Sequence, residues 1–258
     1  MRVGIFQCAA GGLSQQERLN KLASALSEVR TDIVVCPELF MSGYNIGESL
    51  LELAEAQDGP FARQVADLAT SSGTAILYGY PERDDTRVYN SALCIDNKGR
   101  QIANHRKLLL PPGFESEIFN SGERLTLFTL NGVPCAILIC YDAEFPEAVR
   151  AATDAGASIV FVPTALVDSW GLVAFKIMPT RAFENGVWLV YANHAGTENQ
   201  ANYLGSSCIV APDGKDAVRA GAEETLIWTD LDMQRVTTAR SRLPYGQDAE
   251  RLRKIVGV

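Results

Sequence analysis

The chain has 258 residues, a formal net charge of −8 and 47% hydrophobic residues, values that describe an acidic globular protein. The length fits one large α/β domain or two small ones, and the negative charge argues against nucleic acid or an anionic membrane as the main partner. No apolar run approaches the length of a transmembrane helix, so no membrane partner is expected.

The cysteines and histidines limit the chemistry that the chain can support. Six cysteines lie in apolar runs without CxxC spacing: Cys8, Cys36, Cys94, Cys135, Cys140 and Cys208. Only His105 and His194 could partner them, so zinc binding and Cys-His catalysis are both disfavoured, and we expect no metal. The chain starts as a strand rather than as a signal peptide, which with the free cysteines indicates a reducing, cytoplasmic location.

The first half of the chain alternates predicted strands and helices. Apolar runs and helical spacing predict strands at 3–8, 32–36 and 74–80 and helices at 14–30 and 50–71. Residues 88–95 and 101–106 form a predicted hairpin closed by Asn97-Lys98-Gly99, and after a loop at 108–123 a further strand covers 125–130.

The second half repeats this order. We predict strands at 133–139, 158–162, 187–192, 204–210 and 225–229, and helices at 148–155 and 173–185. We find no linker, so residues 1–258 are expected to form a single domain, with the polar segment 240–258 as an arm or final helix. The alternation predicts a sheet covered by helices, with active-site groups at the carboxyl ends of the strands.

The stretch 133–147 organises the second half. Its apolar run stops at Cys140, and Pro146 and acidic residues follow, as at the first turn of a helix. Backbone N–H groups and the helix dipole at such a place favour a thiolate and can bind an oxyanion. Cys140 is therefore a candidate nucleophile, although a small buried hydrophobic residue is the alternative.

Polar residues follow three other predicted strands. Glu38 comes after the strand at 32–36, Lys107 after the hairpin, and Thr164 after the strand at 158–162. Taken singly, a glutamate there is more often a helix-entry residue and a lysine is usually solvated.

Five motifs together are more specific than any one of these positions. They are VVCPE at 34–38, HRK at 105–107 with LP at 110–111, CYDAEFPE at 140–147, RAFEN at 181–185, and GSS at 205–207 with PDG at 212–214. In this order the chain resembles the nitrilase (carbon–nitrogen hydrolase) superfamily. The resemblance implies a four-layer αββα sandwich, a catalytic set of Glu38, Lys107 and Cys140, and a second glutamate at Glu115. It also implies a homodimer or larger homo-oligomer.

The residue types suit amide hydrolysis. Cys140 would attack the carbonyl to give a thioester, with Glu38 moving the protons. Lys107, kept cationic between Glu38 and Glu115, and the backbone N–H of Tyr141 would hold the oxyanion. This chemistry requires no cofactor.

The substrate class is narrowed by the nucleophile motif. Cys140-Tyr141-Asp142 looks like amidases and carbamoylases rather than nitrilases, and the motif most resembles bacterial amidases acting on small carboxamides. The alternatives are ω-amidases, including deaminated-glutathione amidases, N-carbamoyl amidohydrolases, nitrilases, and a binding protein that has lost catalysis. By position, the substrate pocket is predicted to include Tyr44, Glu144, Thr164 and Trp170; ordinary core packing is the alternative for Trp170.

Overall fold

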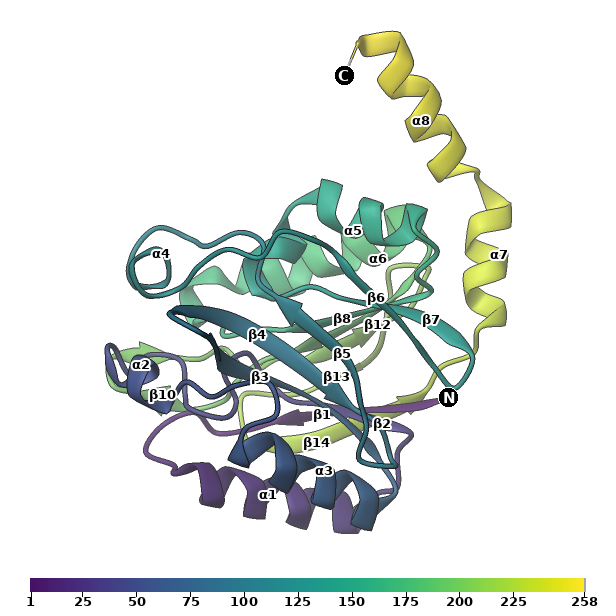
Figure 1. Cartoon of the computed structure of the whole chain (residues 1–258). Helices are drawn as coiled ribbons and strands as arrows, with labels where there is room; N and C mark the ends of the chain where they lie inside the picture. The colour runs from purple at the N-terminus through teal and green to yellow at the C-terminus, as the bar shows by residue number, and fades with distance from the viewer. Residues whose placement is uncertain (258) are drawn as a thin grey trace.

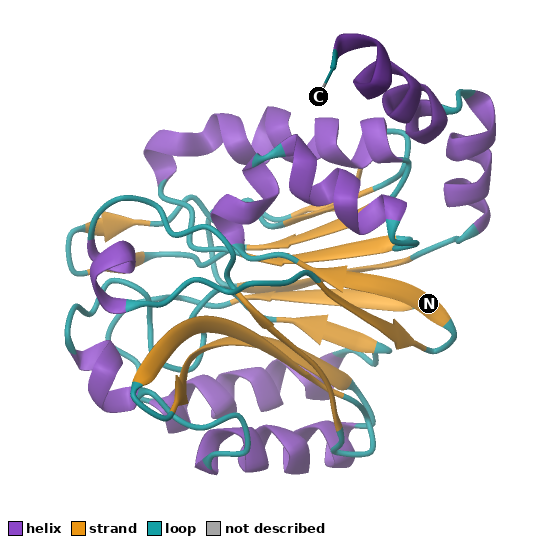
Figure 2. Ribbon diagram, turned by 45° about the horizontal axis from the view of Figure 1, so that its top comes forward, coloured by secondary structure: helices purple, strands orange, loops and turns teal. Residues whose placement is uncertain are grey.

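Two β-sheets lie face to face in the middle of the molecule, and helices cover the outer side of each (Figure 1, Figure 2). The computed structural model describes residues 1–257. Within them the first six-stranded sheet has the order β14-β1-β2-β3-β4-β5, and the second has the order β13-β12-β9-β8-β7-β6. The predicted four-layer αββα sandwich is therefore confirmed.

The first half of the chain builds most of the first sheet and its helices. These elements are β1 (Arg2–Gln7), α1 (Gln15–Glu28), β2 (Ile33–Val35), α2 (Ser49–Leu53), α3 (Pro60–Ser72), β3 (Ala75–Asp84), β4 (Arg87–Ile95) and β5 (Gln101–Arg106), and β14 (Thr225–Asp230) joins them from the second half. Strands β1, β2 and β3 run parallel, and β14 and β4 pair antiparallel at the two sides of this trio.

The second sheet and the remaining elements follow. They are α4 (Phe114–Ile118), β6 (Thr126–Leu130), β7 (Val133–Ile137), α5 (Pro146–Asp154), β8 (Ile159–Pro163), α6 (Met178–Asn185), β9 (Trp188–Ala192), β12 (Cys208–Val210), β13 (Asp216–Arg219), the ribbon β10 (Thr197–Glu198) with β11 (Ala201–Asn202), α7 (Gln234–Arg242) and α8 (Tyr245–Val256). Short 3₁₀ helices at Cys140–Glu144 and Asp168–Trp170 and a π-helix at Val173–Ile177 complete the list.

Three apolar layers hold the sandwich together. Alternate residues of one strand point to opposite faces, so Ile159 and Phe161 of β8 pack between the sheets while Val160 and Val162 pack under α5 and α6. Helices α1 and α3 cover the other sheet in the same way. Because both faces of each central strand are buried, these strands read as continuous apolar runs, which is why the sequence predicts them well.

The structure departs from the prediction at several places, of which three are informative. The helix at 50–71 is two helices, α2 and α3, because Gly59 caps and Pro60 begins a new helix. The strand predicted at 204–210 is only β12, since Gly205 and Ser206 have φ values of +65° and +53° and turn the chain. Strand β13 was not predicted at all, because Asp216 and Arg219 make it polar.

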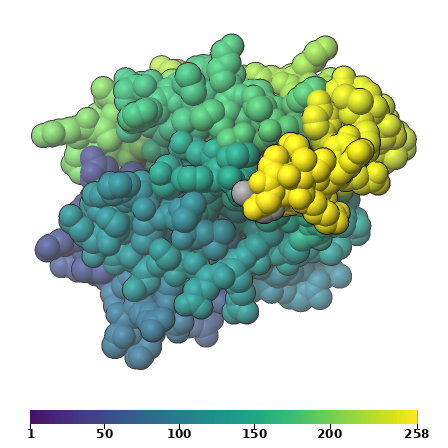
Figure 3. All heavy atoms as spheres, turned by 90° about the horizontal axis from the view of Figure 1, so that it is seen from above, coloured from purple at the N-terminus to yellow at the C-terminus, as the bar shows by residue number. Residues whose placement is uncertain are grey.

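The C-terminal segment leaves the sandwich. Helix α8 projects from one side of the molecule (Figure 1, Figure 3), and none of its residues is buried. Its side chains Leu252, Ile255 and Val256 are exposed. Among residues 1–257, no helix combines the length and hydropathy that crossing a membrane requires.

Candidate active site

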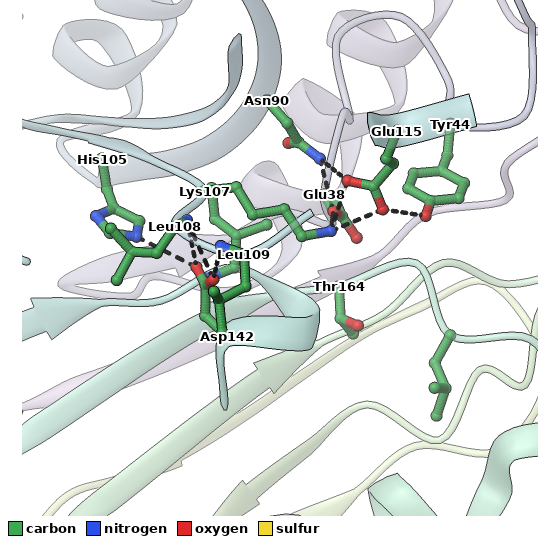
Figure 4. A network of polar contacts seen from close by, with 12 residues as sticks. Glu38, Tyr44, Asn90, His105, Lys107, Leu108, Leu109, Glu115, Asp142 and Thr164 are labelled. Carbon is green, nitrogen blue, oxygen red and sulfur yellow. Dashed lines mark hydrogen bonds and ion pairs between the residues drawn. The ribbon is translucent and has the colours of Figure 1, made fainter. Parts of the chain in front are cut away.

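Glu38, Lys107 and Thr164, which follow predicted strands, are brought together at one end of the two sheets (Figure 4). The charges of Glu38 and Lys107 also act on the thiol of Cys140. Glu38 follows β2 of the first sheet and Thr164 follows β8 of the second, and the Glu38 N–H donates to the Thr164 carbonyl at 3.3 Å. Lys107 follows β5, and Cys140 begins the 3₁₀ helix after β7. The sandwich thus joins residues from both sheets at this site.

Lys107 lies at the centre of a buried polar cluster that we call the Lys107 cluster: Lys107, Glu38, Glu115, Asn90 and Tyr44. The Lys107 Nζ donates to Glu38 Oε1 at 2.7 Å and to Glu115 Oε1 and Oε2 at 2.8 and 2.7 Å. The Asn90 amide donates to both carboxylates at 2.7 and 3.1 Å, and the Tyr44 hydroxyl donates to Glu115 at 2.5 Å. Glu38, Lys107 and Glu115 are buried, so these charged groups are paired with each other rather than with bulk water.

This arrangement changes the proton affinity of Glu38. Burial raises the pKa of its carboxyl; Lys107 lowers it in part and Glu115 raises it again, so the pKa is about 7. Burial alone would lower the pKa of Lys107, but the surrounding groups, Glu38 first, raise it above its ordinary value. Lys107 is therefore a cation at neutral pH, as predicted, while Glu38 can both accept and release a proton there.

Cys140 is exposed in a way that the other cysteines are not. It is half-buried, whereas Cys8, Cys36, Cys94, Cys135 and Cys208 are buried. Its φ is +46°, a left-handed conformation that a non-glycine residue adopts at a cost of about 1–3 kcal/mol and that is concentrated at functional sites.

The surroundings of the Cys140 thiol act against the thiolate that the helix dipole was expected to favour. Burial raises its pKa well above the ordinary value, the negative charge of Glu38 adds to this, and Lys107 opposes it. The helix that begins at Cys140 is only a short 3₁₀ turn, so its dipole is too small to offset desolvation. The thiol therefore needs a base before it can act as a nucleophile.

The predicted pocket residues divide into two groups. Tyr44 belongs to the Lys107 cluster, and Thr164 is buried with its hydroxyl donating to the Tyr191 hydroxyl at 3.1 Å. Glu144 is half-buried at the end of the 3₁₀ helix, and burial raises the pKa of its carboxyl. Trp170 is 65% exposed, which excludes core packing. No hydrogen bond within residues 1–257 joins Glu144 or Trp170 to the Lys107 cluster, so their place in a pocket stays a prediction.

Sequence reasoning missed two residues of the site. Asn90 lies in the middle of β4, where a polar side chain inside an apolar run was the only available signal. Asp142 is part of the quoted CYDAEFPE motif, but the motif gives no indication that its carboxylate binds backbone N–H groups of Leu108 and Leu109. Among residues 1–257, no group of three or more His, Cys, Asp or Glu side chains has an arrangement that could hold a metal ion.

Comparison with known proteins defines the class of this fold and site. The family model described as Carbon-nitrogen hydrolase matches residues 2–241. The chain therefore belongs to the carbon–nitrogen hydrolase family and is an enzyme of the nitrilase superfamily, which confirms the family resemblance.

Individual relatives narrow the comparison. The chain is 43% identical to the "Hydrolase in pqqF 5'region" of Pseudomonas protegens over 96% of this chain and 88% of that protein. It is 31% identical to the (R)-stereoselective amidase of a Pseudomonas species, over 89% of this chain and 83% of that one.

A solved structure resembles the whole sandwich. The amidase from Nesterenkonia sp. superposes with a TM-score of 0.85 at 31% identity, covering 94% of each chain. Variants of that amidase have been solved in complex with butyramide, and with covalent addition of the acetamide moiety of fluoroacetamide at the active site cysteine.

Proposed function

We propose that this protein is an amidase that hydrolyses a small linear carboxamide to a carboxylate and ammonia through a thioester on Cys140. The observation that carries the proposal is the Lys107 cluster beside a half-buried cysteine: Lys107 contacts Glu38 and Glu115 at 2.7 Å, and all three side chains are buried. The amides bound by the Nesterenkonia amidase support this substrate class.

The first half of the reaction forms the thioester. The Cys140 sulfur attacks the amide carbon while its proton passes to Glu38, whose pKa of about 7 suits a base near neutrality. Lys107 and the backbone N–H of Tyr141 stabilise the oxyanion, a contribution of roughly 10²–10³ in rate for each donor. The C–N bond then breaks, and Glu38 delivers the proton to the departing ammonia.

The second half releases the acid. Glu38 takes a proton from water, whose oxygen attacks the thioester carbon. The C–S bond breaks, Cys140 recovers its proton, and the carboxylate leaves. Glu115 is assigned to holding Lys107 and the substrate amide, because its two oxygens accept from the Lys107 Nζ and Tyr44 donates to it. Glu144, Thr164 and Trp170 are proposed to line the rest of the pocket.

A panel of small amides and the matching nitriles tests the proposal. We expect ammonia release from amides, unchanged rates in EDTA, much slower turnover of nitriles, and no turnover by Cys140→Ala. A nitrile consumed faster than its amide would instead assign the protein to the nitrilases, and a panel without turnover would favour a binding protein.

The cysteine itself can be tested by labelling. Limiting iodoacetamide should modify Cys140 before the other five cysteines, since those are buried, and activity should fall in proportion. Peptide mapping that found Cys36 or Cys208 modified first, with activity intact, would contradict the assignment.

We also propose that the protein is a homodimer or larger homo-oligomer. The exposed apolar side chains Leu252, Ile255 and Val256 of α8 support an association of copies. Light scattering that gave a single 28.0 kDa species at all micromolar concentrations would contradict it.

A further inference from the structure

Asp142 connects the cysteine turn to the lysine segment through its buried carboxylate. Its Oδ1 accepts from the backbone N–H of Leu108 at 3.1 Å and of Leu109 at 2.8 Å (Figure 4). Its Oδ2 accepts from the N–H of Ile139 at 3.1 Å. The side chain is fully buried. One carboxylate therefore binds the residue before Cys140 and the two residues after Lys107.

On the cysteine side, this carboxylate closes a strained turn. Cys140 has a φ of +46°, and such a conformation persists only where the surrounding contacts over-determine it. The Asp142 carboxylate spans the turn from its far side to Ile139, while the Asp142 N–H donates to the Ile139 carbonyl at 3.0 Å. Two hydrogen bonds between Ile139 and Asp142 therefore span Cys140 and hold its turn in place.

On the lysine side, the same carboxylate accepts hydrogen bonds from the residues that follow the end of the sheet. Strand β5 ends at Arg106, although the Lys107 N–H still donates to the backbone carbonyl of Asn90 at 2.8 Å. Leu108 and Leu109 have left the sheet, and their N–H groups bind Asp142 instead of a neighbouring strand. Three backbone N–H groups from the two segments therefore share one buried carboxylate, which ties the segments to each other.

His105 completes the surroundings of this carboxylate. Its Nε2 lies 3.5 Å from Asp142 Oδ2, and its Nδ1 lies 3.2 Å from the Thr126 hydroxyl. His105 is fully buried as well, so the carboxylate is enclosed on the side away from the Lys107 cluster.

We infer that Asp142 is a positioning residue that fixes the separation of the Cys140 thiol and the Lys107 ammonium. The inference rests on the proposed amidase function, in which these two groups act on the same carbonyl. Asp142 touches neither reacting group and acts only through the backbone. A displacement of about 1 Å between a nucleophile and its oxyanion donor can reduce the rate about a hundredfold.

Asp142→Asn is the appropriate variant. An asparagine has one acceptor oxygen and one donor group, so it cannot accept from both Ile139 and Leu108–Leu109, and its NH₂ group faces an N–H donor on one side. We expect kcat for a small amide to fall about a hundredfold with KM changed less than about threefold. We also expect the rate of Cys140 alkylation by iodoacetamide to change, because the turn is released.

Asp96 provides a matched control. It is another nearly buried aspartate, 7% exposed, whose carboxylate accepts from the Lys98 and Arg100 N–H groups at 2.9 Å. It stands at the opposite end of β5 from Lys107. Asp96→Asn should lower the melting temperature as Asp142→Asn does, yet leave kcat and Cys140 alkylation at wild-type values.

The outcomes separate the two proposals. If Asp142→Asn matches Asp96→Asn in kcat and in alkylation rate, Asp142 only stabilises the fold and the inference is wrong. If Asp142→Asn does not fold, Asp142→Glu keeps the charge but lengthens the side chain; wild-type kcat and alkylation in that variant would also overturn the inference. If the wild type hydrolyses no amide, the proposed function fails, while the alkylation rates still test the positioning of Cys140.

Discussion

Two buried ion-pair clusters that are both linked to Tyr44 differ in what their carboxylates bind. In the Lys107 cluster one cation contacts two carboxylates at 2.7 Å. In the second, which we call the Arg18 cluster, Arg18 of α1 faces Glu198 of β10 at 3.9 Å. Both pairs are almost fully buried, so solvent screening does not distinguish them.

The Arg18 cluster holds a loop in place. Glu198 Oε2 accepts from the N–H groups of Tyr44 and Asn45 at 3.0 and 2.5 Å and from the Tyr203 hydroxyl at 2.9 Å. The fit is close, because a Cβ at Gly43, which has a φ of +93°, would lie 2.3 Å from Glu198 Oε1. Oε2 of Glu198 thus accepts three hydrogen bonds.

The Lys107 cluster has a different set of contacts around its carboxylates. Glu38 Oε2 has no hydrogen-bond partner among residues 1–257, and the pKa of this carboxyl is raised to about 7, first by burial. A carboxylate with an unused oxygen next to a thiol can accept a proton, whereas the Oε2 of Glu198 is occupied by two backbone N–H groups and a hydroxyl and binds the loop. The unpaired oxygen and the raised pKa support the proposed role of Glu38 as the base. Tyr44 joins the two, through its backbone N–H and its hydroxyl.

Removing the unsatisfied carboxylate should have the largest effect. Glu38→Gln cannot take the proton of the Cys140 thiol, whose raised pKa makes a base necessary. We expect amide turnover to fall about 10²–10⁴-fold and Cys140 alkylation to slow as well. Ammonia release and iodoacetamide rates measure both, with circular dichroism as the folding control. Near-normal turnover in this variant would show that Glu38 is not the base.

Glu115→Gln should distinguish the role of Glu115 from that of Glu38 in the Lys107 cluster. It keeps a side chain of the same size but removes the charge that contacts Lys107 at 2.7 Å. We expect turnover to fall by about a hundredfold through misplacement of Lys107 and the substrate, with Cys140 alkylation nearly unchanged. Ammonia release and Cys140 alkylation are measured on the same variant. Normal turnover would show that Glu115 has no role in catalysis, and the proposed catalytic set would then be Glu38, Lys107 and Cys140.

The fold was largely predictable because its central strands are buried on both faces. Continuous runs such as Ile159–Pro163 cannot be mistaken for surface segments. The edge strand β13 was missed because it is polar. The break between α2 and α3 was missed because the apolar spacing continues across Gly59-Pro60, although this pair is itself a signal for the start of a new helix. Turn geometry at Gly205 likewise shortened β12.

Site residues could be predicted from the sequence only where they lie in a motif of the family. Glu38, Lys107, Glu115 and Cys140 come from motifs of the family, and the structure brings the first three into direct contact. The residues that hold them were not found. Glu198, for example, lies 154 positions from Tyr44, and such pairing depends on the arrangement of both sheets rather than on any local pattern.

The pH dependence of turnover tests the Lys107 cluster directly, because the carboxyl of Glu38 should titrate near neutrality. Glu38 acts as a base when ionised, and its pKa is about 7. Below that pH the carboxyl is protonated, so kcat/KM should fall about tenfold per pH unit and should reach a plateau above about 8. A pH profile of amide hydrolysis tests this; a rate that stays constant between pH 5 and 8 would contradict the assignment of Glu38.

The smallest effect on catalysis should come from the Arg18 cluster. Glu198→Gln keeps an acceptor for the loop but leaves the buried Arg18 without its counter-charge. We expect the free energy of unfolding to fall by about 3–5 kcal/mol, as for other broken buried pairs. Turnover should fall only tenfold or less, roughly the loss of one hydrogen bond, because Glu198 reaches the site only through Tyr44.

Tyr44→Phe supplies the comparison for this last prediction, since it removes the hydroxyl that donates to Glu115 at 2.5 Å and leaves the backbone contact with Glu198 intact. If Glu198 acts through Tyr44, the double variant should lose no more turnover than the worse single variant, while the loss of stability remains that of Glu198→Gln. Amide kinetics and thermal unfolding of the wild type and three variants measure both quantities. If the losses of the two single variants multiply in the double variant, Glu198 acts on the Lys107 cluster by a route other than Tyr44. The two clusters would then share one function.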